Sequence, residues 1–436
     1  MVLRGDRRGV RGYVVLYLLW LAFTLCYGYG LVQADLAARL HRGTVVVLDA
    51  GLGREDGKGI SDLEAEEDAP MDFALWRETP GGIFADSEGR SRLPAAVVDC
   101  FGSTRLACQD GSAPELLFED GEGCLLSADL ARELFGSENV VGQTLFCRNR
   151  QMVIRGILRR GRGQIVLQAG EEFAETMDRL TVGGTGSRAD AFLLRHGLSG
   201  QKLSLDYASL AAKLAAWILL LFVGLYPLYG AYRLSKECPA VLCAAERGGY
   251  PAPDSRETEW PVVMEEKAAV SYPRSRAFIH RICILAAACL YLCLLIPSMG
   301  WGGSFSVNEL LPTKWSDFAF WSRKGQEVAA SIGFLFGSEK TEGEQMVLWT
   351  AAVGIFFLFL AFLFYWRTAR RLAGVSVYTL AALIFFHWAG LAVLAVRCGE
   401  ISAVLAAHRS LWLAAPFGIA AVWQRGRASD CVSRNP

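Results

Sequence analysis

Three ionisable side chains lie within long apolar segments near the end of the sequence: His387, His408 and Arg409. Titratable groups are costly inside a bilayer, so such residues are candidates for a substrate or coupling route. Arg409 lies only about eight residues from the predicted outer end of its segment, so its long side chain can extend towards water. An alternative is a polytopic membrane enzyme that uses His387 and His408 with a metal. It predicts that replacing either histidine abolishes activity without loss of folded protein.

Other chemistry has no support in the sequence. There is no Gly-x-x-x-x-Gly-Lys-Ser/Thr loop to hold ATP phosphates, no His-Glu-x-x-His, no Gly-x-Ser-x-Gly and no paired intramembrane aspartates. We therefore expect no catalytic residue, cofactor or metal site in this chain. His41 and His196 are isolated and predict structural or surface roles. The acidic residues between 64 and 68 lack the spacing of a calcium loop, so we expect a solvated face.

Composition predicts a membrane protein. The chain has 436 residues, of which 53% are hydrophobic, a mean hydropathy of +0.28 and a net charge of zero. No Lys/Arg block interleaves with aromatic residues, so no nucleic-acid partner is expected. Four of the twelve cysteines fall in the segment that we place outside the membrane: Cys100, Cys108, Cys124 and Cys147. Up to two disulfides are conceivable, and the three possible connectivities stay open.

Apolar runs of membrane-spanning length predict six transmembrane helices. They cover Tyr13–Val32, Tyr207–Tyr232, Ile282–Met299 and about Met346–Trp366, Val375–Val396 and Ile401–Trp423. Basic residues precede the first run and follow the second, fourth and sixth runs, which places both termini in the cytoplasm, with Lys213 near the outer end of the second. The sequence thus predicts a multi-pass protein of the cell membrane with a large domain outside.

These spans divide the chain into five parts. The first part, residues 1–33, holds a basic N-terminus and the first span, and an extracytoplasmic α+β domain follows at 34–206. The second span lies at 207–232 and a cytoplasmic loop at 233–277. The last part, 278–436, holds four further spans and an outside aromatic segment at 300–345. Within the outer domain, Gly53–Asp68 reads as a mobile surface loop. In the aromatic segment, the run around Trp315 predicts an anchor at the headgroup level, or else a contact for the outer domain or a lipid-like substrate.

The stretch Gly123–Leu158 predicts a strand, a helix and a hairpin in that order. Ser127 is placed to cap a helix with its side-chain oxygen, and Gly136 to end it in the left-handed conformation. Thr144–Cys147 and Gln151–Leu158 then predict two strands joined by a tight polar turn. We expect the apolar face of the helix to pack against this sheet; the residues concerned are Leu130, Leu134 and Phe135 on the helix and Val153 and Ile157 on the sheet.

This order of residues resembles the extracytoplasmic core domain of MacB/FtsX-type ABC transporter permeases. The matching residues are Ser127, Leu130, Ala131, Leu134, Phe135 and Gly136, then Val141, Gly142 and Thr144, then Val153, Gly156 and Ile157. The clear match covers about thirty residues, and the motif pattern also occurs in other α+β domains. The family pattern has four spans with a compact final trio, whereas six are predicted here.

The resemblance implies a permease subunit that performs no covalent chemistry. A separate cytoplasmic ABC ATPase would move the spans, and the outer domains of two permease chains, identical or different, would open or close against each other as mechanotransmission. The cytoplasmic segment 238–249 would dock on that ATPase through Pro239, Leu242, Glu246 and Arg247. The same segment also fits a helix on the membrane surface or a disordered connection. A functional alternative is a membrane-anchored sensor or assembly protein whose outer domain binds a ligand without transport.

Overall fold

The computed structural model describes two compact units, one α+β and one helical. It describes residues 10–40, 43–84, 92–108, 113–118, 120–148, 150–159, 162–171, 173–237, 318–372 and 375–397, with the single residues 282, 286, 289 and 419. The α+β unit comprises Ala34–Ala211 and Trp301–Ala352, and the rest forms the helical unit. Most of the predicted third span and all but one residue of the sixth lie outside the described residues, as do His41, Trp315 and the cytoplasmic segment 238–277.

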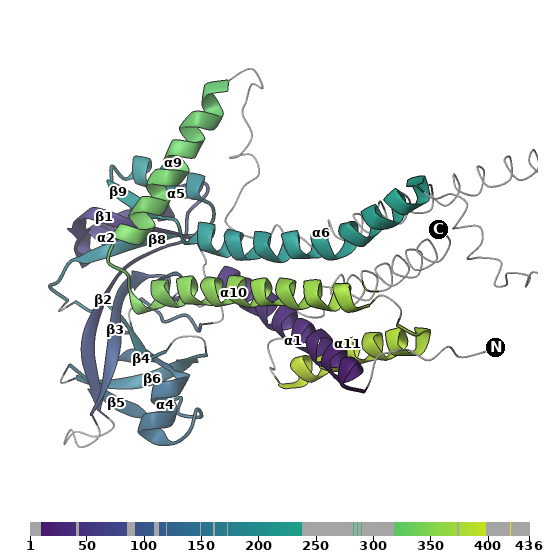
Figure 1. Cartoon of the computed structure of the whole chain (residues 1–436). Helices are drawn as coiled ribbons and strands as arrows, with labels where there is room; N and C mark the ends of the chain where they lie inside the picture. Colours follow the sequence, from purple (N-terminus) through teal and green to yellow (C-terminus); the bar gives the residue numbers. More distant parts are fainter. Residues whose placement is uncertain are drawn as a thin grey trace, which may run out of the picture. The chain divides into compact units, whose positions relative to one another are not determined.

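One nine-stranded sheet forms the centre of the α+β unit (Figure 1). Its strands are β1 (Thr44–Leu52), β2 (Phe73–Phe84), β3 (Arg92–Gly102), β4 (Gly123–Ser127), β5 (Thr144–Cys147), β6 (Arg150–Leu158), β7 (Gln164–Gln168), β8 (Met177–Val182) and β9 (Gly200–Leu203). The strand order is β3-β7-β4-β6-β5-β2-β8-β1-β9, and β2 also pairs with β3. This extra pairing closes β2, β3, β7, β4, β6 and β5 into a ring, from which β8, β1 and β9 extend.

Alternation along the strands of the ring separates two cores. Val97, Cys124, Leu126, Ile165 and Leu167 belong to one hydrophobic cluster. Their direct neighbours in the chain face the opposite side and belong to another; these are Val98, Leu125 and Val166. The first cluster takes residues from all six strands of the ring, so it is the core of the ring.

The predicted strand, helix and hairpin are confirmed. β4 leads into α4 (Ala128–Phe135), and β5 and β6 follow as an antiparallel hairpin, with β6 parallel to β4. Leu130 is buried in the core of the ring, and Leu134, Phe135 and Ile157 pack against that core half-buried. Gly136 ends α4 with φ of 70°, as expected for a left-handed cap.

The expected cap of α4 is wrong in one respect. Ser127 is the N-cap residue, but its side chain makes no capping hydrogen bond. Its Oγ instead accepts a hydrogen bond from the backbone N–H of Gln164, the first residue of β7, at 3.1 Å. Ser127 is fully buried in the sheet, so its hydroxyl serves a backbone group of the neighbouring chain segment.

The loop predicted at Gly53–Asp68 is also wrong, because α2 (Arg54–Ala65) occupies most of it. Its buried residues Gly57, Ile60 and Glu64 recur on one helical face. A Cβ on Gly57 would lie 2.7 Å from the ring of Phe101, so glycine is needed there for close packing. The many charged residues of this stretch lie on the opposite, solvated face of the helix. Their number led to the prediction of a loop, whereas packing of the buried face stabilises a helix.

Short helices complete the α+β unit. They are α3 (Thr104–Ala107) and α5 (Gly186–Arg195), and α9 (Phe318–Gly337) adds a longer helix from the aromatic segment. Leu335 near the end of α9 is buried in a cluster of this unit, whereas Trp321 near its start is 52% exposed. The described part of the predicted aromatic segment therefore packs at one end and is exposed at the other.

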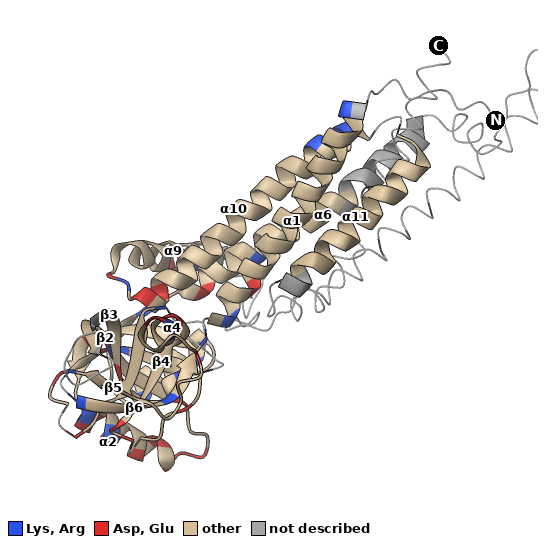
Figure 2. Ribbon diagram, turned by 90° about the horizontal axis from the view of Figure 1, so that it is seen from below, with Lys and Arg blue, Asp and Glu red and all other residues tan. Residues whose placement is uncertain are grey.

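The helical unit holds parts of α1 (Val10–Leu40), α6 (Leu205–Glu237) and α10 (Glu342–Arg371), together with α11 (Val377–Arg397). Four of the described helices are long and apolar enough to cross a membrane, and they cover the predicted first, second, fourth and fifth spans. In Figure 2 these helices carry few charged residues along their length, and the charges of α10 gather at its two ends. The described residues thus account for four of the six predicted spans.

Candidate functional site at the start of helix α10

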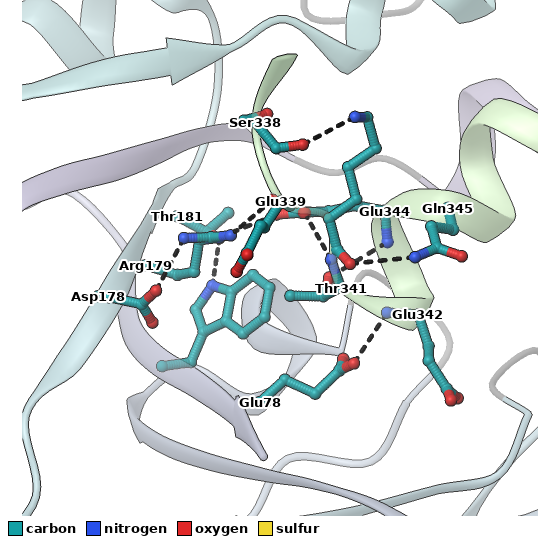
Figure 3. A network of polar contacts seen from close by, with 12 residues as sticks. Glu78, Asp178, Arg179, Thr181, Ser338, Glu339, Thr341, Glu342, Glu344 and Gln345 are labelled. Carbon is teal, nitrogen blue, oxygen red and sulfur yellow. Dashed lines mark hydrogen bonds and ion pairs between the residues drawn. The ribbon is translucent and has the colours of Figure 1, made fainter. Parts of the chain in front are cut away.

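The first turn of α10 is fixed to the α+β unit by a network of polar contacts, here called the α10 anchor (Figure 3). It consists of Glu78 on β2, Arg179 on β8, and Glu339, Thr341, Glu342 and Glu344 around the start of α10. All of these residues belong to the α+β unit.

Arg179 and Glu344 form the centre of the anchor. Arg179 Nε donates to Glu344 Oε1 at 3.3 Å, and its Nη2 donates to the carbonyl oxygen of Glu339 at 3.0 Å. The side chains of Arg179 and Glu344 are 7% and 0% exposed. Two buried opposite charges require each other, since removing one leaves the other uncompensated in a poorly solvated site.

A capping box starts α10 at the same place. Glu344 Oε2 accepts from the backbone N–H of Thr341 at 2.9 Å, and Thr341 Oγ1 accepts from the N–H of Glu344 at 3.4 Å. Glu344 thus caps its own helix with one carboxylate oxygen and holds Arg179 with the other. Sequence reasoning missed this residue, although Thr341-x-x-Glu344 before an apolar run is the pattern of a capping box.

Glu78 adds a contact that depends on protonation. Its Oε1 accepts from the backbone N–H of Glu342 at 2.8 Å. Burial, followed by the nearby carboxylates of Glu342 and Glu344, raises the pKa of Glu78 to about 7, although the hydrogen bond from Glu342 and the charge of Arg179 oppose this. The carboxyl group therefore exchanges its proton near neutral pH.

A second buried carboxylate connects α2 to α5. Glu64 Oε1 lies 2.8 Å from Arg195 Nη1 and 2.7 Å from His196 Nε2, and Oε2 accepts from the N–H of Met71 at 2.7 Å. Burial alone would raise the pKa of Glu64, but the hydrogen bonds from Met71, His196 and Arg195 lower it. The expected solvated role of Glu64 is wrong, and His196 has a structural contact.

Of the three candidate intramembrane residues, His387, His408 and Arg409, the structure describes His387. It is fully buried, and its Nδ1 lies 2.8 Å from Thr24 Oγ1, so it connects α11 to α1. Thr24 Oγ1 also donates to the carbonyl oxygen of Trp20, and Trp20 Nε1 donates to the carbonyl oxygen of Leu383 at 2.7 Å. His387 thus belongs to a contact between helices.

The other predicted site residues lie outside the described residues: His408 and Arg409, and Pro239, Leu242, Glu246 and Arg247 of the coupling segment. Among the residues that are described, no group of three His, Cys, Asp or Glu side chains could hold a metal ion. Cys100, Cys108, Cys124 and Cys147 are all buried as free thiols. Burial raises the pKa of Cys124 to about 12 and that of Cys147 to about 11, so these thiols are poor nucleophiles in the folded chain.

The chain has low similarity to known proteins in both sequence and structure. No protein-family model and no curated protein matches the sequence. Among solved structures, the periplasmic region of MacB from Actinobacillus actinomycetemcomitans matches with 12% identity and a TM-score of 0.29, over 38% of this chain and 90% of that one. The extracellular domain of the noncanonic ABC-type transporter YknZ from Gram-positive bacteria matches with 9% identity and a TM-score of 0.28, over 37% and 98%.

Proposed function

We propose that this chain is a permease subunit of an ABC transporter, which transmits movement between a membrane bundle and an outer domain. The observation that carries the proposal is the α10 anchor. A helix of membrane-spanning length begins in the α+β unit with a buried ion pair and a capping box, so its first turn is fixed to the sheet. A displacement of α10 along its axis would therefore be passed to β2 and β8.

Two further features support the proposal. The strand, helix and hairpin on which the resemblance to MacB/FtsX-type permeases rests are present at the expected residues. In addition, α1 and α6 begin or end in the α+β unit and continue in the helical unit, as α10 does. Three unbroken helices between two units suit a mechanism that transmits force, because a helix is stiffer than a loop.

The energy source in this proposal is a separate cytoplasmic ATPase, and the working complex contains a second permease chain. ATP binding by the ATPase would favour one packing of the spans over another, and the difference in affinity for the two states would drive the change. The segment 238–249 remains the proposed docking site for the ATPase. The transported substrate, if there is one, is outside the proposal.

The test is a pull-down of the tagged full-length chain from its native membranes in mild detergent. The proposal expects a P-loop ATPase in stoichiometric amount, lost when residues 238–249 are replaced by a Gly-Ser linker of equal length. A folded, intact chain that brings down no ATPase would contradict the proposal. That result would favour the alternative predicted from the sequence, a membrane-anchored sensor or assembly protein.

A further inference from the structure

Helix α9 exposes large apolar side chains along one of its faces. Trp321, Ile332 and Phe336 are 52%, 38% and 76% exposed. They share a face because their positions follow the repeat of about 3.6 residues per turn. Gly325 and Ala329 lie on the same face and are also exposed. These five residues are here called the apolar stripe of α9.

The charged residues of α9 lie on its other faces. They are Arg323, Lys324 and Glu327, and none of them falls at a position of the apolar stripe. Lys324 and Glu327 pair with each other at 3.1 Å. Two basic residues and one acidic residue leave the helix with a small positive charge. α9 is therefore an amphipathic helix whose exposed apolar side is not interrupted by charge.

The end of α9 is held close to the start of α10. Leu335 of α9 and Val347 of α10 belong to the same buried cluster of the α+β unit. Only Ser338–Thr341 separate the two helices, so Gly337 lies within about 17 Å of Glu342 along the chain. From there the start of α9 projects beyond the sheet (Figure 1). The position of α9 is thus tied to that of the first turns of α10.

These first turns of α10 lead into an apolar run. Trp349 lies near the start of that run, after the acidic residues Glu342 and Glu344 of the first turn, and it is 69% exposed. An exposed tryptophan at the end of an apolar span is typical of the boundary between headgroups and hydrocarbon. Trp349 is about 10 Å along the helix from Glu342. The end of α9 therefore lies close to the level of the bilayer surface that Trp349 indicates.

Both ends of α9 lead to segments of membrane-spanning length. α10 follows it, and the sequence predicts the third span at Ile282–Met299 before it. A bilayer is thus the large apolar phase within reach of the apolar stripe, and leaving the stripe in water would cost free energy. Tryptophan and phenylalanine on one face with basic residues on another are also the composition of helices that lie in the bilayer interface.

We propose that α9 lies in the outer surface of the bilayer, with its apolar stripe towards the hydrocarbon and Arg323 and Lys324 among the headgroups. The partner of this face is a lipid surface. The sequence predicted an anchor around Trp315, and the stripe extends that anchor over the length of α9. The contact needs neither the ATPase nor transport, so it stands or falls separately from the proposed function.

The test is photo-crosslinking of the full-length chain in nanodiscs of phosphatidylcholine and phosphatidylglycerol. The photoreactive residue p-benzoylphenylalanine replaces Ile332 in the stripe or, as the control, the exposed Ala330 on the opposite face. Mass spectrometry after irradiation should find at least about tenfold more phospholipid adduct at Ile332, because acyl chains surround the buried face of an interfacial helix. Equal adducts at the two positions, or crosslinks from Ile332 to a second copy of the chain in place of lipid, would overturn the proposal.

Two matched variants make the test specific to the stripe. Ala329→Glu places a charge in the stripe, and Ala330→Glu places the same charge on the opposite face. Both alanines are exposed, so neither change disturbs buried packing. With the photoreactive residue at position 332, Ala329→Glu should lower the phospholipid adduct at least about threefold, since a charge is costly in contact with hydrocarbon. Ala330→Glu should leave the adduct unchanged. An equal loss in both variants, or no loss in Ala329→Glu, would contradict the orientation proposed for α9.

Discussion

At the scale of single residues, the buried pair of Arg179 and Glu344 is the contact on which the α10 anchor depends. Both charges are shielded from water, and each also holds backbone groups near the start of α10. A buried pair is weak evidence of net stabilisation, because replacing both partners by apolar residues is often neutral. Removing one partner alone is destabilising, because the other charge stays buried without its counter-charge.

We expect Arg179→Met to destabilise the α+β unit by about 3–5 kcal/mol, because Glu344 remains buried without its counter-charge. The matched control is Arg77→Met on the neighbouring strand β2. Arg77 and Glu175 form an ion pair at 3.0 Å that is 38% and 56% exposed, and an exposed pair is worth about 0–1 kcal/mol. Thermal unfolding of the purified chain, followed by circular dichroism, gives the comparison.

The double variant Arg179→Met with Glu344→Gln separates the burial of charge from other causes, because glutamine keeps an acceptor for the N–H of Thr341. It should recover much of the stability lost in Arg179→Met, since the remaining unpaired charge, Asp178, is 51% exposed. A double variant as unstable as the single one would contradict the role assigned to the pair, because the loss would then come from packing.

Glu78 should make the anchor depend on pH. Its pKa in the folded chain is about 7, above the ordinary value of 4.5, so between these values the folded state binds more protons than the unfolded state. Stability contributed at this site therefore falls as pH rises from about 5 through 7 and levels off above about 8. The groups that face Glu78 are Glu342 and Glu344 from α10 and Arg179 from β8.

Urea unfolding of the purified chain, followed by circular dichroism, measures this dependence. The free energy of unfolding should decrease from about pH 5 to about pH 8.5. Glu78→Gln keeps an acceptor for the N–H of Glu342 without a titrating group, so its stability should fall less over this range. A wild-type profile as flat as that of Glu78→Gln would refute the assignment.

At the scale of elements, small residues and hydrogen bonds hold α1 against its neighbours. A Cβ on Gly28 would lie 2.7 Å from Leu394 of α11, and one on Gly30 would lie 2.8 Å from Leu358 of α10. Thr24 and His387 add a hydrogen bond between α1 and α11. Close approach through small residues and polar contacts is the usual basis of helix association in bilayers.

We expect Thr24→Val to lower the stability of the helical unit by about 0.5–1.5 kcal/mol, the usual range for a hydrogen bond between membrane helices. Thr379→Val near the start of α11 is the control, because among the described residues Thr379 bonds to Ser376 of the same segment. Thermal inactivation in detergent, measured as the loss of monodisperse protein, compares the two. If Thr24→Val were as stable as the wild type, His387 would require another explanation than helix packing.

At the scale of the whole molecule, the α+β unit and the helical unit share three helices. In α10, the residues up to Ala352 belong to one unit and those from Val353 to the other. The proposed mechanism requires that this helix transmit displacement, so a flexible insertion at the boundary should uncouple the units.

We expect a Gly-Gly-Gly-Ser insertion after Ala352 to leave ATPase binding intact and to abolish nucleotide-dependent changes in the protease sensitivity of the α+β unit. The same insertion after Asp68, in an exposed turn, is the control and should preserve those changes. Limited proteolysis of the complex with and without ATP measures both. Preserved changes in the Ala352 variant would show that α10 is not the route of coupling.

The sequence by itself determined the features that depend on near neighbours in the chain. The apolar runs predicted the helices of membrane-spanning length, and the pattern from Gly123 to Leu158 predicted β4, α4, β5 and β6 within a residue or so. These signals are local, because helical and strand periods repeat within a few residues. The predictions at Ser127 and at α2 were wrong because contacts with residues distant in the chain decided the local structure. These contacts are with Gln164 for Ser127 and with Phe101 for α2.

Only the tertiary structure decided which distant residues meet. Arg179 and Glu344 are separated by 165 positions and Asp99 and Arg148 by 49, and no spacing in the sequence marks either pair. The ring closes because β2 pairs with both β3 and β5. In each pair a buried charge lies next to an opposite partner because the fold brings together segments that are far apart in the chain.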